Sequence, residues 1–272
     1  MDYLNRTKSS LTTYIETLQG RGCYSFLKVD ALKALGTNEE SFDRDVRRLV
    51  HKKRLVVIKP GFLIIIPIEY KSWGSIPPDW FIKDLMTYLN IPYYVGLLSA
   101  AALYGAAHQQ PQQFQVITNK VVRRIHKGKA NIWFFNKEHI KETPVDELQT
   151  QTGRMRVSTP EATALDLVKF YKRAGYLSNV ATVLLELAEK LDPKTLIETA
   201  KLAHYEWPTI QRLGYLLSCK EIGGEHIVEP LAKWLKESQP RFVPLVSYKT
   251  YEDKHRDEQW RIYINESIEV DL

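Results

Sequence analysis

Cationic side chains gather on one side of a helix that the sequence predicts between residues 37 and 53. Apolar residues with helical spacing form one stripe of it, and they are Phe42, Val46, Leu49 and Val50. Polar and basic residues lie on the opposite stripe or at its edges, and they are Ser41, Arg44, Arg47, Arg48 and His51. Arginines on an exposed helix face suit guanine edges and phosphates in a DNA major groove. A solvated charged face gives the same pattern, so the helix alone does not decide between these interpretations.

The segments around this helix predict an N-terminal winged helix-turn-helix over residues 1–70. Two helices precede it, and a capping box of Thr37 and Glu40 is expected to begin it. Two apolar β-rich runs follow, joined by a turn at 59–61. The residues expected to face the DNA are Ser41, Arg44, Arg47 and Arg48, with Lys52 and Lys59 on phosphates. A winged helix used only for protein interaction remains the alternative.

A second basic set lies on a predicted hairpin, whose strands at 121–126 and 130–135 are joined across a Lys-Gly-Lys turn. Its members are Lys120, Arg123, Arg124, Lys127 and Lys129, with His126 among them. They could form a second phosphate-contacting surface, or a face that meets a protein partner or its RNA. Charged residues also protect an exposed sheet edge from pairing with other chains, and this interpretation stands equally.

Charge and composition favour a polyanion partner for the first part of the chain. Residues 1–70 carry 12 Lys or Arg against 8 Asp or Glu, residues 71–175 carry 14 against 8, and residues 176–272 carry 12 against 16. The two cysteines, Cys23 and Cys219, are too few for a disulfide framework or a Cys-based metal site. The polar N-terminus and the short apolar runs predict a cytoplasmic protein.

The pattern of elements predicts an α+β fold with two domains. The winged helix at 1–70 is followed by a second domain over 71–272, with a small sheet in 71–175 and a mainly helical part in 176–272. Residues 70–79 contain Gly, Ser and two prolines, and they are expected to form the linker.

Residue patterns for catalysis are weak, so the sequence predicts neither an enzyme nor a cofactor or metal site. Asp192-Pro193-Lys194 contains an Asp-x-Lys pattern, but Asp192 is better explained as a helix cap before a proline. Gly74-Ser75 is not followed by the Asp-x-Asp pair that a nucleotidyltransferase needs for its metal ions. No Walker-type phosphate loop and no His-x-x-x-His pair occurs in the sequence.

Two stretches together resemble the AbiEi family, the antitoxins of bacterial abortive-infection pairs. The first contains Tyr94, Leu97 to Ala101 and Gly105 to Gln109, and the second runs from Arg156 to Leu167. The strand at 114–118 lies between them in the expected order, and the winged helix also fits. The resemblance covers about residues 7 to 240, and the tail after Pro240 has no counterpart.

The resemblance implies a repressor of its own toxin–antitoxin operon that binds double-stranded operator DNA and takes part in phage defence. It also implies that the chain neutralises a nucleotidyltransferase-like toxin, without a stable complex between the two proteins. The alternative is a winged-helix transcriptional regulator whose C-terminal domain senses a ligand or a partner.

Overall fold

The computed structural model describes residues 10–106, 111–252 and 255–270, and it confirms an α+β fold. Contacts within the chain group these residues into two compact units. The first contains residues up to 92, together with 122–133 and 147–155, and the second contains the remainder. The residues at 107–109 that contribute to the family resemblance lie outside the described part.

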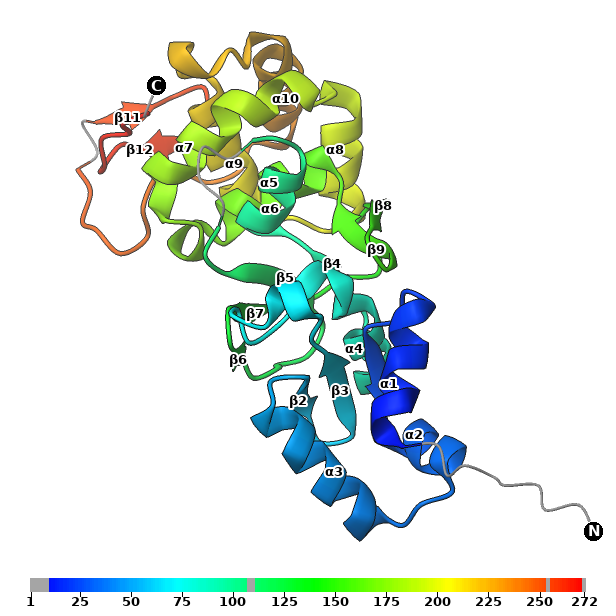
Figure 1. Ribbon diagram of the computed structural model, residues 1–272. Coiled ribbons are helices and arrows are strands. Elements are labelled where there is room, and N and C mark those ends of the chain that lie inside the picture. The colour runs from blue at the N-terminus through cyan, green and yellow to red at the C-terminus, as the bar shows by residue number, and fades with distance from the viewer. Residues whose placement is uncertain (1–9, 107–110, 253–254, 271–272) are drawn as a thin grey trace, which may run out of the picture. The chain divides into compact units, whose positions relative to one another are not determined.

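The first unit begins with helices and strands in the order predicted for residues 1–70 (Figure 1). The elements are α1 (Leu11–Gly20), β1 (Ser25–Leu27), α2 (Lys28–Leu35), α3 (Glu39–His51), β2 (Leu55–Lys59) and β3 (Phe62–Ile65). The strands form an antiparallel sheet in the order β1-β3-β2. Leu11 and Ile15 of α1 pack with Phe42 and Leu49 of α3 in one apolar core, which fixes how α3 is rotated.

Within the predicted linker at 70–79, residues 71–73 are exposed and the residues after them are buried or partly buried. Short 3₁₀ turns at Ile68–Tyr70 and Pro78–Trp80 flank it, and the helix α4 (Ile82–Leu89) follows. Ser75 and Ile76 are each only 1% exposed. The compact unit thus continues past the predicted boundary at residue 70, and independent folding of residues 1–70 stays a prediction. Aromatic residues at both ends of this stretch pack together, with the rings of Tyr70 and Trp80 at 5.2 Å.

A six-stranded sheet has the order β6-β7-β5-β4-β9-β8. Its strands are β4 (Tyr93–Val95), β5 (Phe114–Thr118), β6 (Ile125–Lys127), β7 (Ala130–Asn136), β8 (Val145–Thr150) and β9 (Gly153–Ser158). The strand β4 pairs with β5 in antiparallel fashion and with β9 in parallel fashion. Residues of β7, β8 and β9 are divided between the two compact units, and all six strands lie within residues 71–175, where the sequence predicted a small sheet.

Helices make up much of the second unit, and those from Tyr176 onward lie where the sequence predicted a mainly helical part. They are α5 (Leu97–Leu103), α6 (Pro160–Lys169), α7 (Tyr176–Leu187), α8 (Pro193–Leu202), α9 (Trp207–Leu217) and α10 (Glu225–Ser238). Three short strands follow, and they are β10 (Val243–Pro244), β11 (Arg256–Asp257) and β12 (Ile262–Tyr263). The buried Trp260 ring lies against Gly214 of α9, where no side chain would fit. This contact attaches the tail to the helical core.

A buried ion pair lies at the centre of the second unit. Lys137 Nζ is 2.9 Å from Asp166 Oδ1, and the two side chains are 1% and 0% exposed. The hydroxyl groups of Tyr94 and Tyr205 each donate to Asp166 over 2.7 Å, while Lys137 also donates to Thr143. Burial raises the pKa of both tyrosines well above the usual value, and the Asp166 charge adds to this, so both keep the protons that they donate. Burial lowers the pKa of Lys137, although Asp166 opposes this.

We predict that Asp166→Ala lowers the free energy of unfolding by about 3–5 kcal/mol, because it leaves the Lys137 ammonium buried without its counter-charge. Urea unfolding followed by circular dichroism measures the loss. Replacing both partners, as in Lys137→Met/Asp166→Leu, should recover part of it, because no charge is then left unpaired, although the Tyr94 and Tyr205 hydroxyls lose their acceptor. Glu198→Ala breaks an exposed pair with Lys194 and serves as the control, with a change below about 1 kcal/mol. An Asp166→Ala variant as stable as this control would contradict the prediction.

Candidate nucleic-acid interface

The helix α3 begins at a different cap from the one predicted. The N-cap residue is Asn38, whose side-chain oxygen accepts a hydrogen bond of 2.9 Å from the Ser41 amide. The predicted capping box of Thr37 and Glu40 is therefore wrong by one residue. Asn caps a helix at least as well as Thr does, and Asn38 stands three residues before Ser41, whose amide needs an acceptor. Glu40 is left in the first turn, where it pairs with Arg44 instead.

Burial of one stripe determines which side chains α3 exposes. Phe42, Val46 and Leu49 are 1%, 7% and 3% exposed, as the periodicity predicted. Val50 was placed on the same stripe, but it is 39% exposed. Val50 is exposed because it lies eight positions after Phe42. In a helix with 3.6 residues per turn, this spacing places its side chain about 80° around the axis from that of Phe42. The opposite face therefore belongs to the polar residues.

The predicted DNA-facing residues of α3 are accessible. The side chains of Arg44 and Arg48 are 69% and 56% exposed, Arg47 is exposed and Ser41 is partly buried. Arg44 lies 3.7 Å from Glu40, and Arg48 lies 3.0 Å from Asp45. Exposed pairs of this kind contribute about 0–1 kcal/mol, so a phosphate can replace the carboxylate at little cost.

The remaining acidic groups of α3 are held at the start of α2. Lys28 Nζ lies 3.2 Å from Glu39 and 2.9 Å from Asp43. The hydrogen bonds that Lys28 donates to these carboxylates raise the pKa of Lys28, with Asp43 contributing most. Each acid on α3 therefore has a basic partner within 4.0 Å, and none is left to repel a polyanion without compensation.

The turn of the β2–β3 hairpin is packed against the protein. Tyr88 Oη of α4 donates to the Pro60 carbonyl over 2.6 Å, and the Lys28 amide donates to the Gly61 carbonyl over 2.9 Å. Gly61 has φ +84°, and a Cβ there would lie 2.7 Å from Tyr88 Oη. Lys59 is only partly exposed, whereas Lys52 at the end of α3 is exposed. This turn is thus less accessible than a freely projecting wing would be.

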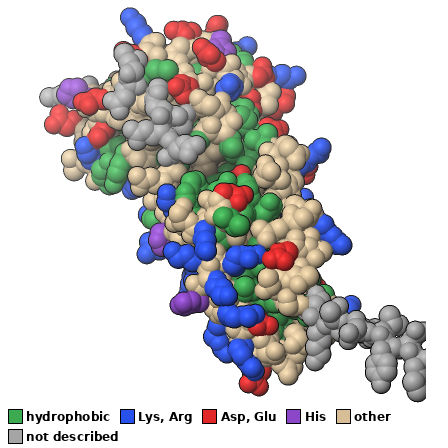
Figure 2. All heavy atoms as spheres, viewed as in Figure 1, with side chains coloured by type: hydrophobic (Ala, Val, Ile, Leu, Met, Phe, Trp, Pro, Cys, Tyr) green, Lys and Arg blue, Asp and Glu red, His purple; other side chains and the backbone are tan. Residues whose placement is uncertain are grey.

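The second basic set is divided between the two units. Lys120 belongs to the second unit, whereas the other four residues belong to the first, together with α3. We name residues 123–129 the basic hairpin segment; its members Arg123, Arg124, Lys127 and Lys129 are all exposed. The strand β6 within it contacts β2. Figure 2 shows Lys and Arg side chains gathered over α3, β2 and β6 on the visible face of this unit.

Contacts with Trp73 and Gly74 hold the turn of the basic hairpin segment. The Lys129 amide donates to the Trp73 carbonyl over 2.9 Å, and its ammonium lies 4.7 Å from the centre of the Trp73 ring. A Cβ at Gly128 would overlap the backbone of Trp73 and Gly74. Sequence periodicity did not reveal this docking, because the partners are more than 50 positions apart; the Lys-Gly-Lys turn was the only signal.

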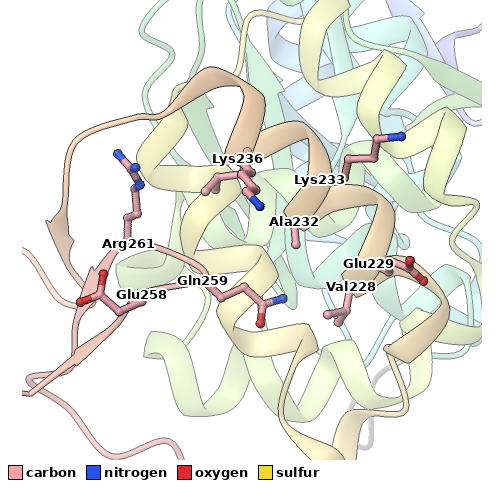
Figure 3. Close-up of a pocket in the computed structure, with 9 residues that line it drawn as sticks. Val228, Glu229, Ala232, Lys233, Lys236, Glu258, Gln259 and Arg261 are labelled. Carbon is pink, nitrogen blue, oxygen red and sulfur yellow. The ribbon is translucent and has the colours of Figure 1, made fainter.

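A groove in the second unit could hold a ligand. It has a volume of about 750 Å³ and lies beside α10 and the β11–β12 turn (Figure 3). Its lining combines apolar and charged side chains, and they are Val228, Glu229, Ala232, Lys233, Leu235, Lys236, Glu258, Gln259 and Arg261. Among residues 10–106, 111–252 and 255–270, no cluster of three or more His, Cys, Asp or Glu could hold a metal ion. Within those same ranges no helix is long and apolar enough to cross a membrane.

The middle of the chain matches a known protein family, and the whole chain has a fold similar to that of a solved structure. Residues 94–219 match the family model described as the AbiEi antitoxin C-terminal domain. The RV2827C protein from Mycobacterium tuberculosis has a similar fold, with a TM-score of 0.64, 14% identity, and coverage of 92% of this chain and 89% of that one. An antigenic nucleotidyltransferase-like protein from Paracoccidioides brasiliensis gives a TM-score of only 0.33 at 9% identity, over 59% of this chain and 87% of that one. No curated protein sequence matches the chain.

We predict that Asn38→Ala lowers the free energy of unfolding by about 1 kcal/mol, because the Ser41 amide loses its acceptor. Asn38→Asp should retain the stability, since Asp is an equally good cap. Thr37→Ala is the matched control, and it should change little. Urea unfolding of all three variants measures these changes. A larger loss of unfolding free energy in Thr37→Ala than in Asn38→Ala would support the capping box predicted from the sequence.

Proposed function

From the match of residues 94–219 to the AbiEi antitoxin C-terminal domain, we propose that the chain is a DNA-binding antitoxin of this family. A role in a toxin–antitoxin pair follows from the family. The finer proposal is that the chain binds double-stranded operator DNA in the cytoplasm, represses its own operon and opposes a nucleotidyltransferase-like toxin in phage defence. It does so as a regulator and not as an enzyme.

One observation carries the DNA-binding part. The buried stripe of α3 turns Arg44, Arg47 and Arg48 outward on one helix, within a unit of helices followed by a β-hairpin. A winged helix-turn-helix presents its recognition helix in this way, with basic side chains toward the major groove. We assign Ser41, Arg44, Arg47 and Arg48 to base and backbone contacts, and Lys52 and Lys59 to phosphates.

The groove beside α10 supports a second candidate function. Its volume of about 750 Å³ falls within the range of ligand pockets, and an apolar floor between charged residues suits a small amphipathic molecule. In that case the chain is a winged-helix regulator whose C-terminal part senses a ligand. A neighbouring reading frame for a nucleotidyltransferase favours the antitoxin instead.

We predict that Arg44→Ala costs about 1–3 kcal/mol of binding free energy on operator DNA, if this arginine holds a guanine edge. Lys59→Ala should weaken binding to all duplexes equally and reduce the salt slope by about one unit. Fluorescence anisotropy with the duplex upstream of the gene, at several salt concentrations, measures both effects. Lys190→Ala/Lys194→Ala, which alters two exposed lysines of the second unit, is the control. A folded Arg44→Ala/Arg48→Ala variant with unchanged affinity would falsify the DNA-binding assignment.

We also predict that the two activities of the antitoxin separate. The Arg44→Ala/Arg48→Ala variant of the full chain should lose repression yet still rescue cells that express the toxin. Point variants are suited to this test, because a cut at residue 70 would divide the first compact unit. Growth is scored with the antitoxin under a foreign promoter. If rescue requires both arginines, the chain protects the cell only by repressing the operon.

The purified pair should not co-elute on gel filtration at micromolar concentration, since the proposed neutralisation is indirect. Tight co-elution would instead favour direct inhibition of the toxin.

A further inference from the structure

We propose that the basic hairpin segment, residues 123–129, is a second DNA-contacting arm that holds phosphates beside the site of α3. This inference rests on the proposed DNA binding by α3 and extends it to a part of the chain that is distant in sequence. The arm belongs to the same compact unit as α3, and its strand β6 contacts β2. Figure 2 shows the cationic side chains over α3, β2 and β6 on one face of that unit.

Charge balance favours phosphate as the ligand of this arm. Residues 122–133 contain Arg123, Arg124, Lys127 and Lys129 and no Asp or Glu. On α3, by contrast, Glu40 and Asp45 offset the arginines. The arm therefore contributes uncompensated positive charge, which DNA phosphates attract whatever the base sequence.

The arm has the rigidity that a fixed contact with the duplex requires. Gly128 fits against the backbone of Trp73 and Gly74, where any side chain would overlap them. The Lys129 ammonium is stacked on the Trp73 ring at 4.7 Å, and its amide is bonded to the Trp73 carbonyl. Lys129 is thus part of the attachment, and Arg123, Arg124 and Lys127 are left for phosphates.

The packed turn of the β2–β3 hairpin explains why such an arm is needed. Tyr88 and the Lys28 amide occupy the Pro60 and Gly61 carbonyls, and Lys59 is only partly exposed, so this turn offers few cationic groups to DNA. The β6–β7 turn, which is exposed and basic, lies in the same unit and supplies backbone contacts in addition to that of Lys59. Gly128 and Trp73 act as positioning residues for it.

The experiment compares three variants of the full chain on two duplexes, the region upstream of the gene and an unrelated sequence of equal length. In Arg123→Gln/Arg124→Gln/Lys127→Gln, both affinities should fall by the same factor, roughly tenfold to a hundredfold at physiological salt, and the salt slope by about two to three units. Gly128→Ala keeps all the charges but displaces the turn, so it should reduce the slope as well. Lys190→Gln/Lys194→Gln/Lys220→Gln removes the same charge from exposed sites of the second unit and should change neither quantity.

Two results would overturn the proposal that the basic hairpin segment contacts DNA. One is a triple variant with wild-type affinity and slope, while Arg44→Ala/Arg48→Ala abolishes binding, since α3 would then act alone. The other is a triple variant that binds DNA normally but no longer rescues cells from the toxin, which would assign the segment to the toxin or its RNA. If the α3 variant also binds normally, the proposed function itself fails. Circular dichroism and thermal unfolding establish that each variant is folded, which is expected because the three replaced side chains are exposed.

Discussion

The second unit is built around the buried contact between Lys137 and Asp166. These residues, with the tyrosines that donate to Asp166, join the strand β4, the segment after β7, the helix α6 and the connection between α8 and α9. Removing two charges from water is costly, and the attraction between them repays this cost only when the geometry is good and the other polar atoms are satisfied. Our hypothesis is that the pair selects one arrangement of these elements, because a shifted α6 would leave Asp166 without its three partners.

The first unit depends on a different constraint, the burial of an apolar stripe. Phe42, Val46 and Leu49 have one low-energy orientation, toward α1 and the sheet. The same rotation that buries them exposes Arg44, Arg47 and Arg48. A basic face therefore arises here from the same packing that stabilises the unit, so the proposed binding surface is compatible with a stable fold.

Local patterns predicted the elements well, and long-range contacts account for what they missed. The period of α3 and the turn at Gly61 were predictable because each depends on neighbouring residues. The cap at Asn38 was missed by one position, as is common at helix ends, and the exposure of Val50 was missed because it lies about 80° around the helix from Phe42. Ile76 in the predicted linker is buried by partners that no local pattern reveals. The ion pair was missed for the same reason, since Lys137 and Asp166 are 29 positions apart.

The charges of the first unit suggest a division of labour between its two basic segments. The arginines of α3 already pair with acidic neighbours. Binding a DNA phosphate therefore adds little free energy, because one weak ion pair replaces another. Bidentate contact with a guanine offers them more, so α3 is suited to distinguishing sequences. The basic hairpin segment contains no Asp or Glu. Each phosphate that it contacts therefore adds binding free energy, whatever the base sequence. Phosphate contacts set the register of a protein on DNA, whereas base contacts set the choice of site. If the proposed DNA binding holds, one unit contains both kinds of surface, and the docking of Gly128 on Gly74 fixes the position of the arm within that unit.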